Sequence, residues 1–503
     1  MKQRAPLTPV AVTVALAAAC GLAFLTAPTA GPADAGRAAG AARMPVERSV
    51  LVCPSPSTSD IAETTYTSLT PGKATGDGRG GDKDARPSAR LATKEGKTVL
   101  EPKEPGRPVA ATASGAEAPA LTGAAEGVLA PGWTAQQTTE VSVGQARGLL
   151  GVACSVPATD FWFPGVSTAR GRQDYLHLTN PDDTVAEVDI KLYGPDGLLK
   201  AKPGTADAVI AVEPRSTTKV LLSSLAPEAP LPNVTAHVTT GSGRVGVSAQ
   251  IAEDGVGADW LPASEGPAGS LVLPGIPADA TSVRLVAFAP GEDDADLALA
   301  LSGPTGSISP AGNEQLHLKA GMTSDVDLGA LTRGEAGSLL LTPVDPRKAV
   351  PVVAALRVVR GTGAKQELGF IPASAPVGAR ATVADNRTGD KATNTLALTN
   401  AAGADATVRI TATAGTDGGE GVVKEVTVKA GTTLAIGAPP APAGGKGAYA
   451  LTLETLSGGP VHAARTLTLP RDGIPMFTVQ TFTDDRSTVS VPRAVEDPSI
   501  LIR

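Results

Sequence analysis

The side chains with the widest chemical range in this chain are its four histidines, which could act as acid–base groups or as metal ligands. None has another His, a Cys or an acid at a metal-ligand spacing, and each lies in a strand-like stretch next to apolar residues. We interpret them as edge-strand or solvent-facing residues, and we predict no metal site and no bound cofactor. They are His177, His237, His317 and His462.

A serine–lysine pair is the second candidate. Ser216 and Lys219 fit the S-x-x-K pattern, in which a lysine one helical turn from a serine can activate it. The segment reads as a turn followed by a strand, where side chains three positions apart point to opposite faces. No G-x-S-x-G sequence is found elsewhere in the chain. We therefore predict no catalytic residue and expect a protein that is not an enzyme.

Acidic residues gather in two corresponding loops, where carboxylate oxygens could hold calcium. The first loop carries Asp182 and Asp183, and the second reads EDDAD at 292–296. The third copy of this loop reads AAGAD at 401–405, and no EF-hand spacing is present. We favour solvated turns over a calcium site.

Aromatic residues are scarce, 14 in 503, so a run of three stands out. Consecutive strand residues face opposite sides, so all three cannot face one core. We favour an interdomain joint, and the alternative is a ligand-binding platform formed with a neighbouring acidic loop. The residues of this possible ligand or interdomain surface are Phe161, Trp162, Phe163, Asn180, Asp182 and Asp183.

Two cysteines, Cys53 and Cys154, lie in extended apolar stretches after the amino-terminal segment. We predict a disulfide between them, which would close a loop of about 100 residues and stabilise the fold by roughly 4 to 5 kcal/mol through loop-closure entropy. Two free thiols or a thiol catalyst are the alternatives. Cys20 could mark a lipoprotein, but the residue three before it is Ala17 rather than Leu, and the apolar run continues beyond it. We therefore interpret Cys20 as part of an export signal.

The first 35 residues predict export. Lys2 and Arg4 precede an uncharged run at 10–27, and ADA at 33–35 offers a small-residue cleavage site. The run is close to the shortest length that spans a bilayer, so the segment is either a cleaved signal peptide or a single membrane tether. We expect the rest of the chain outside the cytoplasm, secreted or anchored to the cytoplasmic membrane.

An internal repeat organises the exported part. The segment LHLTNPDDTVAEVDIKLYGPDG begins at Leu176, and similar segments begin at Leu285 and Leu396. The three starts are therefore spaced almost evenly, by about 110 residues, which is the size of one small domain. Each repeat is expected to form a unit of its own.

Within each repeat the apolar residues alternate, as at Val188, Ile190 and Leu192, and turns with Gly or Pro recur about every 8 to 12 residues. This pattern is typical of short strands, and no long stretch has the period of a helix. The predicted fold is all-β, with tandem immunoglobulin-like β-sandwich units after the N-terminal signal or anchor segment.

A more divergent copy precedes the three clear ones, because 147–164 is similar to 244–262. Its middle, about 71–127, is rich in Gly, Pro, Ala, Lys and Asp without an apolar period, which predicts a disordered insertion. The predicted divisions are the signal or anchor at 1–35, the divergent β unit at 45–165, and β-sandwich repeats at 166–270, 271–378 and 379–503, the last with a C-terminal extension.

Two segments carry a family resemblance. VCPSP at 52–56 and ACSVPATDFWFPG at 153–165, followed by the first repeat, resemble an uncharacterised family of actinobacterial secreted proteins that is known as a domain of unknown function. The resemblance covers nearly the whole exported part. It implies an extracytoplasmic location, and it carries no reaction, cofactor or catalytic residue.

Composition narrows the function. Against 50 Asp and Glu, the 43 Lys and Arg give a net charge of −7, without the basic excess of a nucleic-acid binder. We expect an exported, non-enzymatic cell-envelope protein that acts as a binding or scaffolding module, with an envelope protein or polysaccharide as partner. The alternatives are an envelope polysaccharide-binding surface protein and a hydrolase with a site assembled between units.

Overall fold

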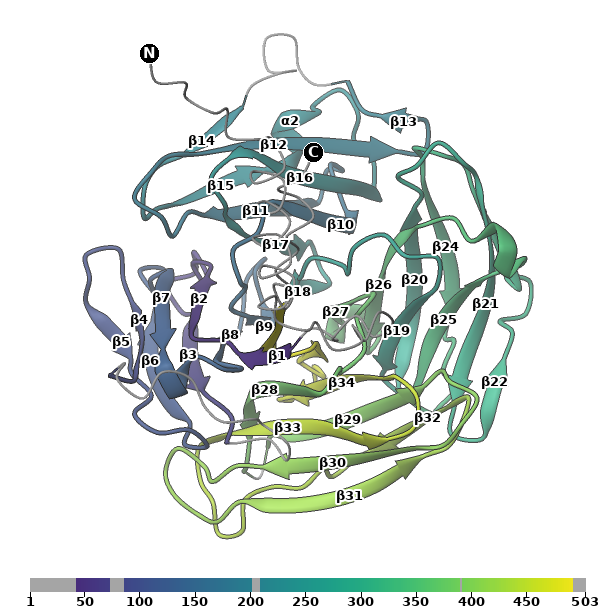
Figure 1. Cartoon of the computed structure of the whole chain (residues 1–503). Helices are drawn as coiled ribbons and strands as arrows, with labels where there is room; N and C mark the ends of the chain where they lie inside the picture. The colour runs from purple at the N-terminus through teal and green to yellow at the C-terminus, as the bar shows by residue number, and fades with distance from the viewer. Residues whose placement is uncertain (1–41, 73–85, 201–208, 390, 492–503) are drawn as a thin grey trace, which may run out of the picture. The chain divides into compact units, whose positions relative to one another are not determined.

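The computed structural model describes residues 42–72, 86–200, 209–389 and 391–491. It is 57% strand and 3% helix. Antiparallel sheets of four or five strands pack in pairs (Figure 1), which confirms the predicted all-β class of tandem β-sandwich units. The predicted signal or anchor segment, with Cys20, lies outside the described residues.

Four sandwiches follow one another along the chain, and we number them 1 to 4. Sandwich 1 contains β2 (Arg48–Cys53), β3 (Glu63–Leu69), β4 (Ser88–Ala92), β5 (Thr98–Leu100), β6 (Val109–Ser114), β7 (Leu121–Glu126), β8 (Thr134–Val141) and β9 (Gly148–Ala153). Sandwich 2 contains β10 (Asp160–Val166), β11 (Arg172–Thr179), β12 (Ala186–Gly194), β13 (Gly197–Leu198), β14 (Ile210–Val212), β15 (Thr217–Leu221), β16 (Val234–Ser242), β17 (Gly246–Glu253) and β18 (Gly257–Leu261).

The second half of the chain repeats this arrangement. Sandwich 3 contains β19 (Leu271–Ile276), β20 (Ala280–Phe288), β21 (Ala295–Gly303), β22 (Gly306–Ile308), β23 (Gln315–Leu318), β24 (Thr323–Gly329), β25 (Gly337–Pro343), β26 (Val353–Arg360) and β27 (Glu367–Pro372). Sandwich 4 contains β28 (Arg380–Arg387), β29 (Thr393–Asn400), β30 (Ala406–Ala412), β31 (Val422–Val428), β32 (Thr432–Ile436), β33 (Ala448–Ser457), β34 (Val461–Thr468) and β35 (Phe477–Phe482).

Short elements lie between and outside the main strands. A separate two-stranded sheet pairs β1 with β36. The short elements are β1 (Ala42–Pro45), η1 (Gly127–Leu129), α2 (Leu222–Leu225), η2 (Pro346–Lys348), η3 (Gly363–Lys365) and β36 (Thr488–Val491).

All four sandwiches share one strand order. When the eight common strands of each are counted from 1 to 8, one sheet has the order 1-6-3-4 and the other has the order 5-2-7-8. In sandwich 4 these sheets are β28-β33-β30-β31 and β32-β29-β34-β35. The pairs 2–5 and 3–6 correspond to the B–E and C–F pairs of immunoglobulin sandwiches. In each of the four units, strand 1 pairs with strand 6. The four units are therefore copies of one architecture.

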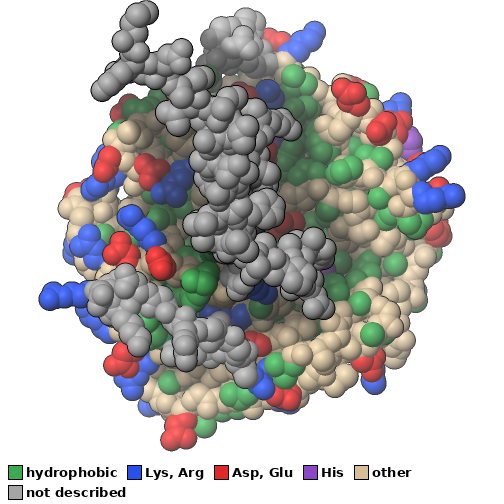
Figure 2. Space-filling model, viewed as in Figure 1, with side chains coloured by type: hydrophobic (Ala, Val, Ile, Leu, Met, Phe, Trp, Pro, Cys, Tyr) green, Lys and Arg blue, Asp and Glu red, His purple; other side chains and the backbone are tan. Residues whose placement is uncertain are grey.

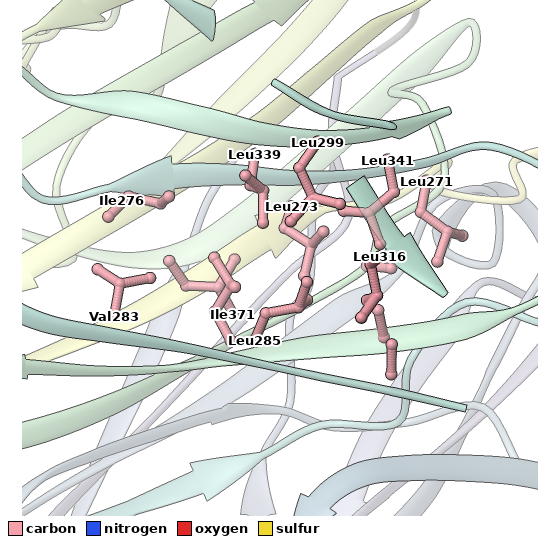
Figure 3. Packing of buried hydrophobic residues seen from close by; sticks show 14 of the residues in the cluster. Leu271, Leu273, Ile276, Val283, Leu285, Leu299, Leu316, Leu339, Leu341 and Ile371 are labelled. Carbon is pink, nitrogen blue, oxygen red and sulfur yellow. The ribbon is translucent and has the colours of Figure 1, made fainter. Parts of the chain in front are cut away.

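Each sandwich encloses its own apolar core. In sandwich 3, Figure 3 shows Leu299 and Leu339 from one sheet facing Leu285 and Ile371 from the other. Along β21 the buried side chains of Leu297, Leu299 and Leu301 alternate with the less buried Ala298 and Ala300, as the period of two requires. Burying one leucine side chain completely stabilises the folded state by about 1.5 to 3 kcal/mol.

The predicted disordered insertion at 71–127 is wrong for residues 86–127, which supply β4 to β7 and thus half of sandwich 1. Small residues occupy positions there that larger apolar residues fill elsewhere, which hid the strand pattern. Gly123 illustrates the reason, because a Cβ at this position would collide with the backbone of Arg90 on the paired strand. Residues 73–85 lie outside the described part of the chain.

The predicted boundary between 165 and 166 is also wrong, because β10 pairs with β16 and is the first strand of sandwich 2. Its Pro164-Gly165 bulge recurs as Pro274-Gly275 in β19, and both bulges shift the strand register. Strand β9 therefore corresponds to β18, whereas the sequence comparison had matched β10 with it.

The sandwiches are joined in a cycle of contacts within residues 45–489. Their eighth strands carry this cycle, because β9 contacts β18, β18 contacts β27, β27 contacts β35, and β35 contacts β9. Arg471 of sandwich 4 also forms an ion pair with Glu140 of sandwich 1. The last sandwich in the sequence thus returns to the first.

Glycines make this close approach possible at all four contacts between eighth strands. A Cβ at each of these glycines would lie within 3 Å of an atom of the neighbouring sandwich, closer than real Cβ atoms come to other groups. The pairs are Gly148 with Ala258, Gly151 with Thr478, Gly257 with Glu367, and Gly369 with Phe477.

Adding one methyl group at such a joint should loosen the protein. In Gly369→Ala the new Cβ would lie 2.8 Å from the ring of Phe477, which is fully buried. We expect the free energy of unfolding to fall by about 1 to 3 kcal/mol, measured by denaturant titration. Gly437→Ala is the control, because nothing lies within 4 Å of its Cβ position. Equal stability of the two variants would contradict the account of the joint.

Candidate functional site

A cavity of about 400 Å³ lies where the four sandwiches meet, and we call it the shared pocket. Its lining includes Gln136 of sandwich 1, Phe161 of sandwich 2, Ser374 next to the end of β27 in sandwich 3, and Gln480 of sandwich 4. The volume is in the range of small-molecule sites. No sandwich could form this pocket by itself.

Three buried side chains of the shared pocket carry a polar atom without a hydrogen-bond partner among the described residues. Their exposed fractions are 1% for Gln136, 4% for Gln480 and 7% for Ser374. The Oε1 atom of Gln136 accepts from the backbone N–H of Asp385 at 3.2 Å, and that of Gln480 accepts from Arg465 Nη2 at 3.1 Å. Because each amide oxygen is engaged, the unpartnered group is the NH₂ donor. Two amide NH₂ groups and one hydroxyl of lining residues thus have no partner among the described residues, and each of these atoms is itself fully buried.

Apolar and charged side chains complete the shared pocket. The buried rings of Trp133 and Phe161 contribute to its wall. Carboxylates outnumber basic groups in the lining, which makes the site unfavourable for anions. The charged lining residues are Asp160, Glu265, Asp484, Asp485 and Arg486.

Buried charges stand directly behind the two glutamines. Asp385, which contacts Gln136, is fully buried and pairs with Arg387 at 3.1 Å. Burial opposes its ionisation, but the Arg387 charge and its hydrogen bonds hold the pKa of Asp385 below its usual range. Burial lowers the pKa of Arg465, which contacts Gln480, to about 10, so its guanidinium stays charged at neutral pH. Of these charged groups, the Arg465 guanidinium holds the amide oxygen of Gln480 directly, whereas Gln136 is held by the backbone N–H of Asp385.

One buried carboxylate connects three sandwiches. Asp259 of β18 accepts from the backbone N–H of Gly151 at 3.1 Å and from the hydroxyl of Thr478 at 3.2 Å. Burial raises the pKa of Asp259 well above its ordinary value. Arg147 plays a similar part next to β9, donating to backbone carbonyls just before β18 and just before β27. The frame around the pocket is thus joined by polar contacts as well as by packing.

The structure separates the three consecutive aromatics. Phe161 lines the shared pocket, and Phe163 is fully buried in the core of sandwich 2. Trp162 faces the other way, where it stacks on His237 with ring centroids 3.6 Å apart and lies 5.5 Å from Phe288 of sandwich 3. The run therefore divides between a pocket, a joint and a core.

The three loop residues grouped with these aromatics do not line the shared pocket. Asn180 is buried, and its Nδ2 donates to two backbone carbonyls of its own sandwich at 2.7 and 2.9 Å. Asp182 pairs with Arg244 at 2.9 Å, and Asp183 pairs with Arg215. All three side chains hold the loop in place.

The histidines lie apart from one another. The interpretation of all four as edge-strand or solvent-facing is wrong for His177, which is buried because β11 is an inner strand of its sheet. Among the described residues, no group of three or more His, Cys, Asp or Glu side chains is placed to hold a metal ion. The contacts are Trp260 for His177, Asp160 for His237, Asp296 for His317 and the Ser374 carbonyl for His462.

The Ser216–Lys219 pair and the acidic loop at 292–296 do not line the shared pocket. Ser216 lies in the turn before β15 and donates to the Glu213 carbonyl, while Lys219 lies within β15. The acidic loop at 292–296 borders an open cavity of about 690 Å³ on sandwich 3, lined by Asp293 and its neighbours. Neither place adds a group to the shared pocket.

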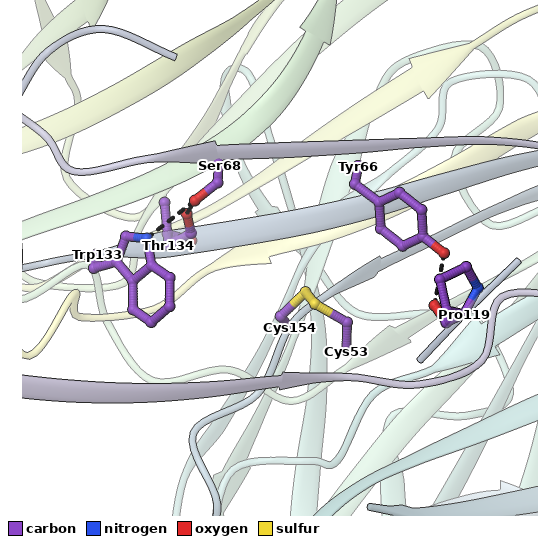
Figure 4. Close-up of a disulfide and its surroundings, with 7 residues drawn as sticks. All are labelled: Cys53, Tyr66, Ser68, Pro119, Trp133, Thr134 and Cys154. Atoms are coloured by element: carbon purple, nitrogen blue, oxygen red, sulfur yellow. Dashed lines mark hydrogen bonds between the residues drawn. A yellow bond between two sulfur atoms is a disulfide. The ribbon is translucent and has the colours of Figure 1, made fainter. Parts of the chain in front are cut away.

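The disulfide between Cys53 and Cys154 is confirmed. It ties the end of β2 to the residue after β9, and Cys154 also lines the shared pocket. Figure 4 shows it between Tyr66, whose hydroxyl donates to the Pro119 carbonyl at 2.7 Å, and Trp133. A structural disulfide is typical of an oxidising compartment outside the cytoplasm.

The fold and the site define a protein of four like β-sandwiches that share one pocket. Residues 109–439 match the family of unknown function DUF5719, which is more than half of the chain, so the chain belongs to this family. The match confirms the resemblance to an uncharacterised family, and the actinobacterial origin stays a prediction. The comparison with curated proteins finds no match.

Two surface properties bear on partners. In the described part of the chain, no helix is both long enough and apolar enough to cross a membrane. On the face shown in Figure 2, Lys and Arg side chains are interspersed with Asp and Glu. A mixed surface of this kind differs from the basic face that nucleic-acid binding uses.

Removing the disulfide should weaken the frame beside the pocket. The bond spans 101 residues of sequence, so Cys53→Ala with Cys154→Ala should lower the free energy of unfolding by about 4 to 5 kcal/mol. Mass analysis after alkylation without reduction should find both cysteines unmodified in the parent protein, and a reduced sample is the control. Alkylation of both without reduction would refute the bond.

The buried His177 should make stability depend on pH. Burial, followed by the nearby Lys219 charge, lowers the pKa of His177 to about 3. The unfolded chain binds this proton below about pH 6.5. Stability is therefore full above that pH and falls as pH decreases toward 3, by up to about 1.4 kcal/mol per pH unit. Denaturant titrations from pH 7 to pH 4 should show a shallower slope for His177→Gln.

His317→Gln is the matched control, because the side chain of His317 is about half exposed. This variant should keep the slope of the parent protein. A slope that His177→Gln leaves unchanged would mean that His177 is accessible to protons in the folded state.

Proposed function

We propose that the chain is an exported, non-enzymatic protein of the cell envelope that binds its partner in the shared pocket, with the four sandwiches as a scaffold. The observation that carries the proposal is the shared pocket itself, a cavity of about 400 Å³ lined by residues of all four sandwiches. Its volume is in the range of small-molecule sites, and no single sandwich encloses it.

Two further observations support the location. The apolar amino-terminal segment after Lys2 and Arg4 has the properties of an export signal. The disulfide between Cys53 and Cys154 is of the kind that persists outside the cytoplasm. The segment at 1–35 serves either as a cleaved signal or as a single tether to the cytoplasmic membrane.

The test fills the shared pocket with a larger side chain and identifies the molecules that stay bound to the purified protein. Val156 lines the pocket and is exposed enough to accept a larger side chain, so Val156→Trp should block the cavity without unfolding the protein. Val423→Trp is the matched control on the exposed face of β31, away from the pocket. Each protein is purified gently from its native envelope and examined by native mass spectrometry, with cross-linking for larger partners.

We expect a bound molecule or a cross-linked partner on the parent protein and on Val423→Trp, and its loss from Val156→Trp. Recovery of the protein from the cytoplasm with reduced cysteines would contradict the proposed location. Labelling by broad hydrolase probes would contradict a non-enzymatic role. A partner retained by Val156→Trp would place binding elsewhere on the protein.

A further inference from the structure

Two acidic side chains lie in the joint between the eighth strands of sandwiches 2 and 3. Glu367 is the first residue of β27, and Asp259 is the third residue of β18. The first and third residues of the other two eighth strands are uncharged, and they are Gly148, Leu150, Phe477 and Val479. Asp259 and Glu367 are the only acids in the four eighth strands.

Each of these acids lies against a glycine of the opposite strand. A Cβ at Gly257 of β18 would collide with Oε1 of Glu367, and a Cβ at Gly369 of β27 would lie 3.5 Å from Oδ2 of Asp259. Along each strand the acid and the glycine are two residues apart. The two strands therefore exchange acids across one joint, and each acid fills the space that a missing side chain leaves.

Both acids are fully buried, with an exposed fraction of 0%. Oδ1 of Asp259 accepts the two hydrogen bonds described above, and Oε1 of Glu367 accepts from the backbone N–H of Leu368 at 3.1 Å. The second oxygen of each acid, Oδ2 or Oε2, has no partner among the described residues. Burying a charged carboxylate with an oxygen in this state is costly, so the neutral, protonated form is favoured.

The strands packed against β18 and β27 carry few charges, and these are already paired. Glu253 of β17 pairs with Arg357 of β26 at 2.7 Å. Arg360 of β26 pairs with Asp279 at 2.8 Å. The other strands in contact with the two, β9, β19 and β35, contain no charged residue. None of these groups is therefore free to neutralise a carboxylate in the joint.

Two arginines outside these strands favour ionisation, but burial outweighs them. Burial raises the pKa of Asp259 well above its ordinary value, against its hydrogen bonds and the charge of Arg465. Burial also raises the pKa of Glu367, against the charge of Arg147, and the charge of Asp259 raises it further. Ionising both acids would therefore place two like charges across a buried joint.

We propose that the joint between sandwiches 2 and 3 is a proton-dependent clasp, which stays closed while Asp259 and Glu367 are protonated and loosens when they ionise. β18 continues into Pro262 and Ser264, and β27 continues into Ala373 and Ser374, all of which line the shared pocket. Loosening of the clasp at high pH would therefore separate two segments of the pocket wall.

The clasp makes stability depend on pH in a defined direction. Because the folded state holds these protons more tightly than the unfolded chain does, stability is highest at low pH and falls as pH rises through the pKa values of the folded state. Above about pH 5, where an unfolded Asp or Glu is ionised, each acid lowers the folding equilibrium constant by up to about tenfold per pH unit.

Neutral variants of the same shape isolate this effect. Asp259→Asn and Glu367→Gln imitate the protonated acids, and Glu335→Gln is the matched control at an exposed residue of sandwich 3. Denaturant titrations of the full chain from pH 5 to pH 9 give the folding equilibrium constants. We expect the variant-to-parent ratio to rise by about tenfold or more over this range for both joint variants, and to stay constant for Glu335→Gln. The titration of His177 is common to all four proteins and cancels in the ratio.

Tryptophan fluorescence reports whether the joint loosens. Trp162 stacks against Phe288 of sandwich 3, and Trp260 is the neighbour of Asp259 in β18. Both indoles are buried, so acrylamide, an uncharged quencher, has little access to them in the closed joint. We expect quenching to increase from pH 6 to pH 9 in the parent protein and to stay constant in the double variant Asp259→Asn with Glu367→Gln.

Two outcomes would overturn the clasp. A stability ratio that stays constant or falls with rising pH would mean that the acids are already charged in the folded protein. A rising ratio without a change in quenching would mean that the acids ionise without loosening the joint. Neither measurement involves the partner of the shared pocket, so failure of the clasp leaves the proposed function as it stands.

Discussion

The close approach of the four eighth strands is the contact on which the rest of this structure depends. Glycine at each contact allows backbone to meet its neighbour, and Asp259 then reaches Gly151 of one sandwich and Thr478 of another. A larger residue at Gly151 or Gly369 would push two sandwiches apart. The shared pocket exists because these strands bring lining residues of all four sandwiches to one place.

The same network stabilises the frame and orients the candidate site. Taking charges such as Asp385 and Arg465 out of water is costly unless each is paired, and losing one partner typically costs about 3 to 5 kcal/mol. The backbone N–H of Asp385 also holds the amide oxygen of Gln136, and the Arg465 guanidinium holds that of Gln480. The contacts that stabilise the frame therefore also hold the lining residues of the shared pocket in place.

Local patterns in the sequence predicted the parts of the fold that local physics decides. Alternation at Val188 and Leu192 indicates buried strand faces, and both residues are buried. The repeated Leu-Thr-Asn segment has a physical basis, because Asn180 and Asn400 each tie down their loop through the same pattern of backbone bonds. The Cys53–Cys154 pair followed from two apolar stretches in an exported chain.

The pocket was missed because its polar residues are far apart in sequence and fit no chemical motif. The strands of residues 86–127 were missed because Ala, Thr and Gly fill their positions. One available signal was the recurrence of glycine in the eighth strands, as at Gly148, Gly257 and Gly369, which marks the joint.

Closure of sandwich 4 onto sandwich 1 is the central claim, and a cysteine pair tests it most directly. Glu140 and Arg471 are in contact although they belong to the first and the last sandwich of the chain. Glu140→Cys with Arg471→Cys should form a disulfide within one molecule, found by peptide mapping, whereas Glu140→Cys with Lys424→Cys should leave both new thiols free. Free thiols at both 140 and 471 in the folded protein would contradict the closed arrangement.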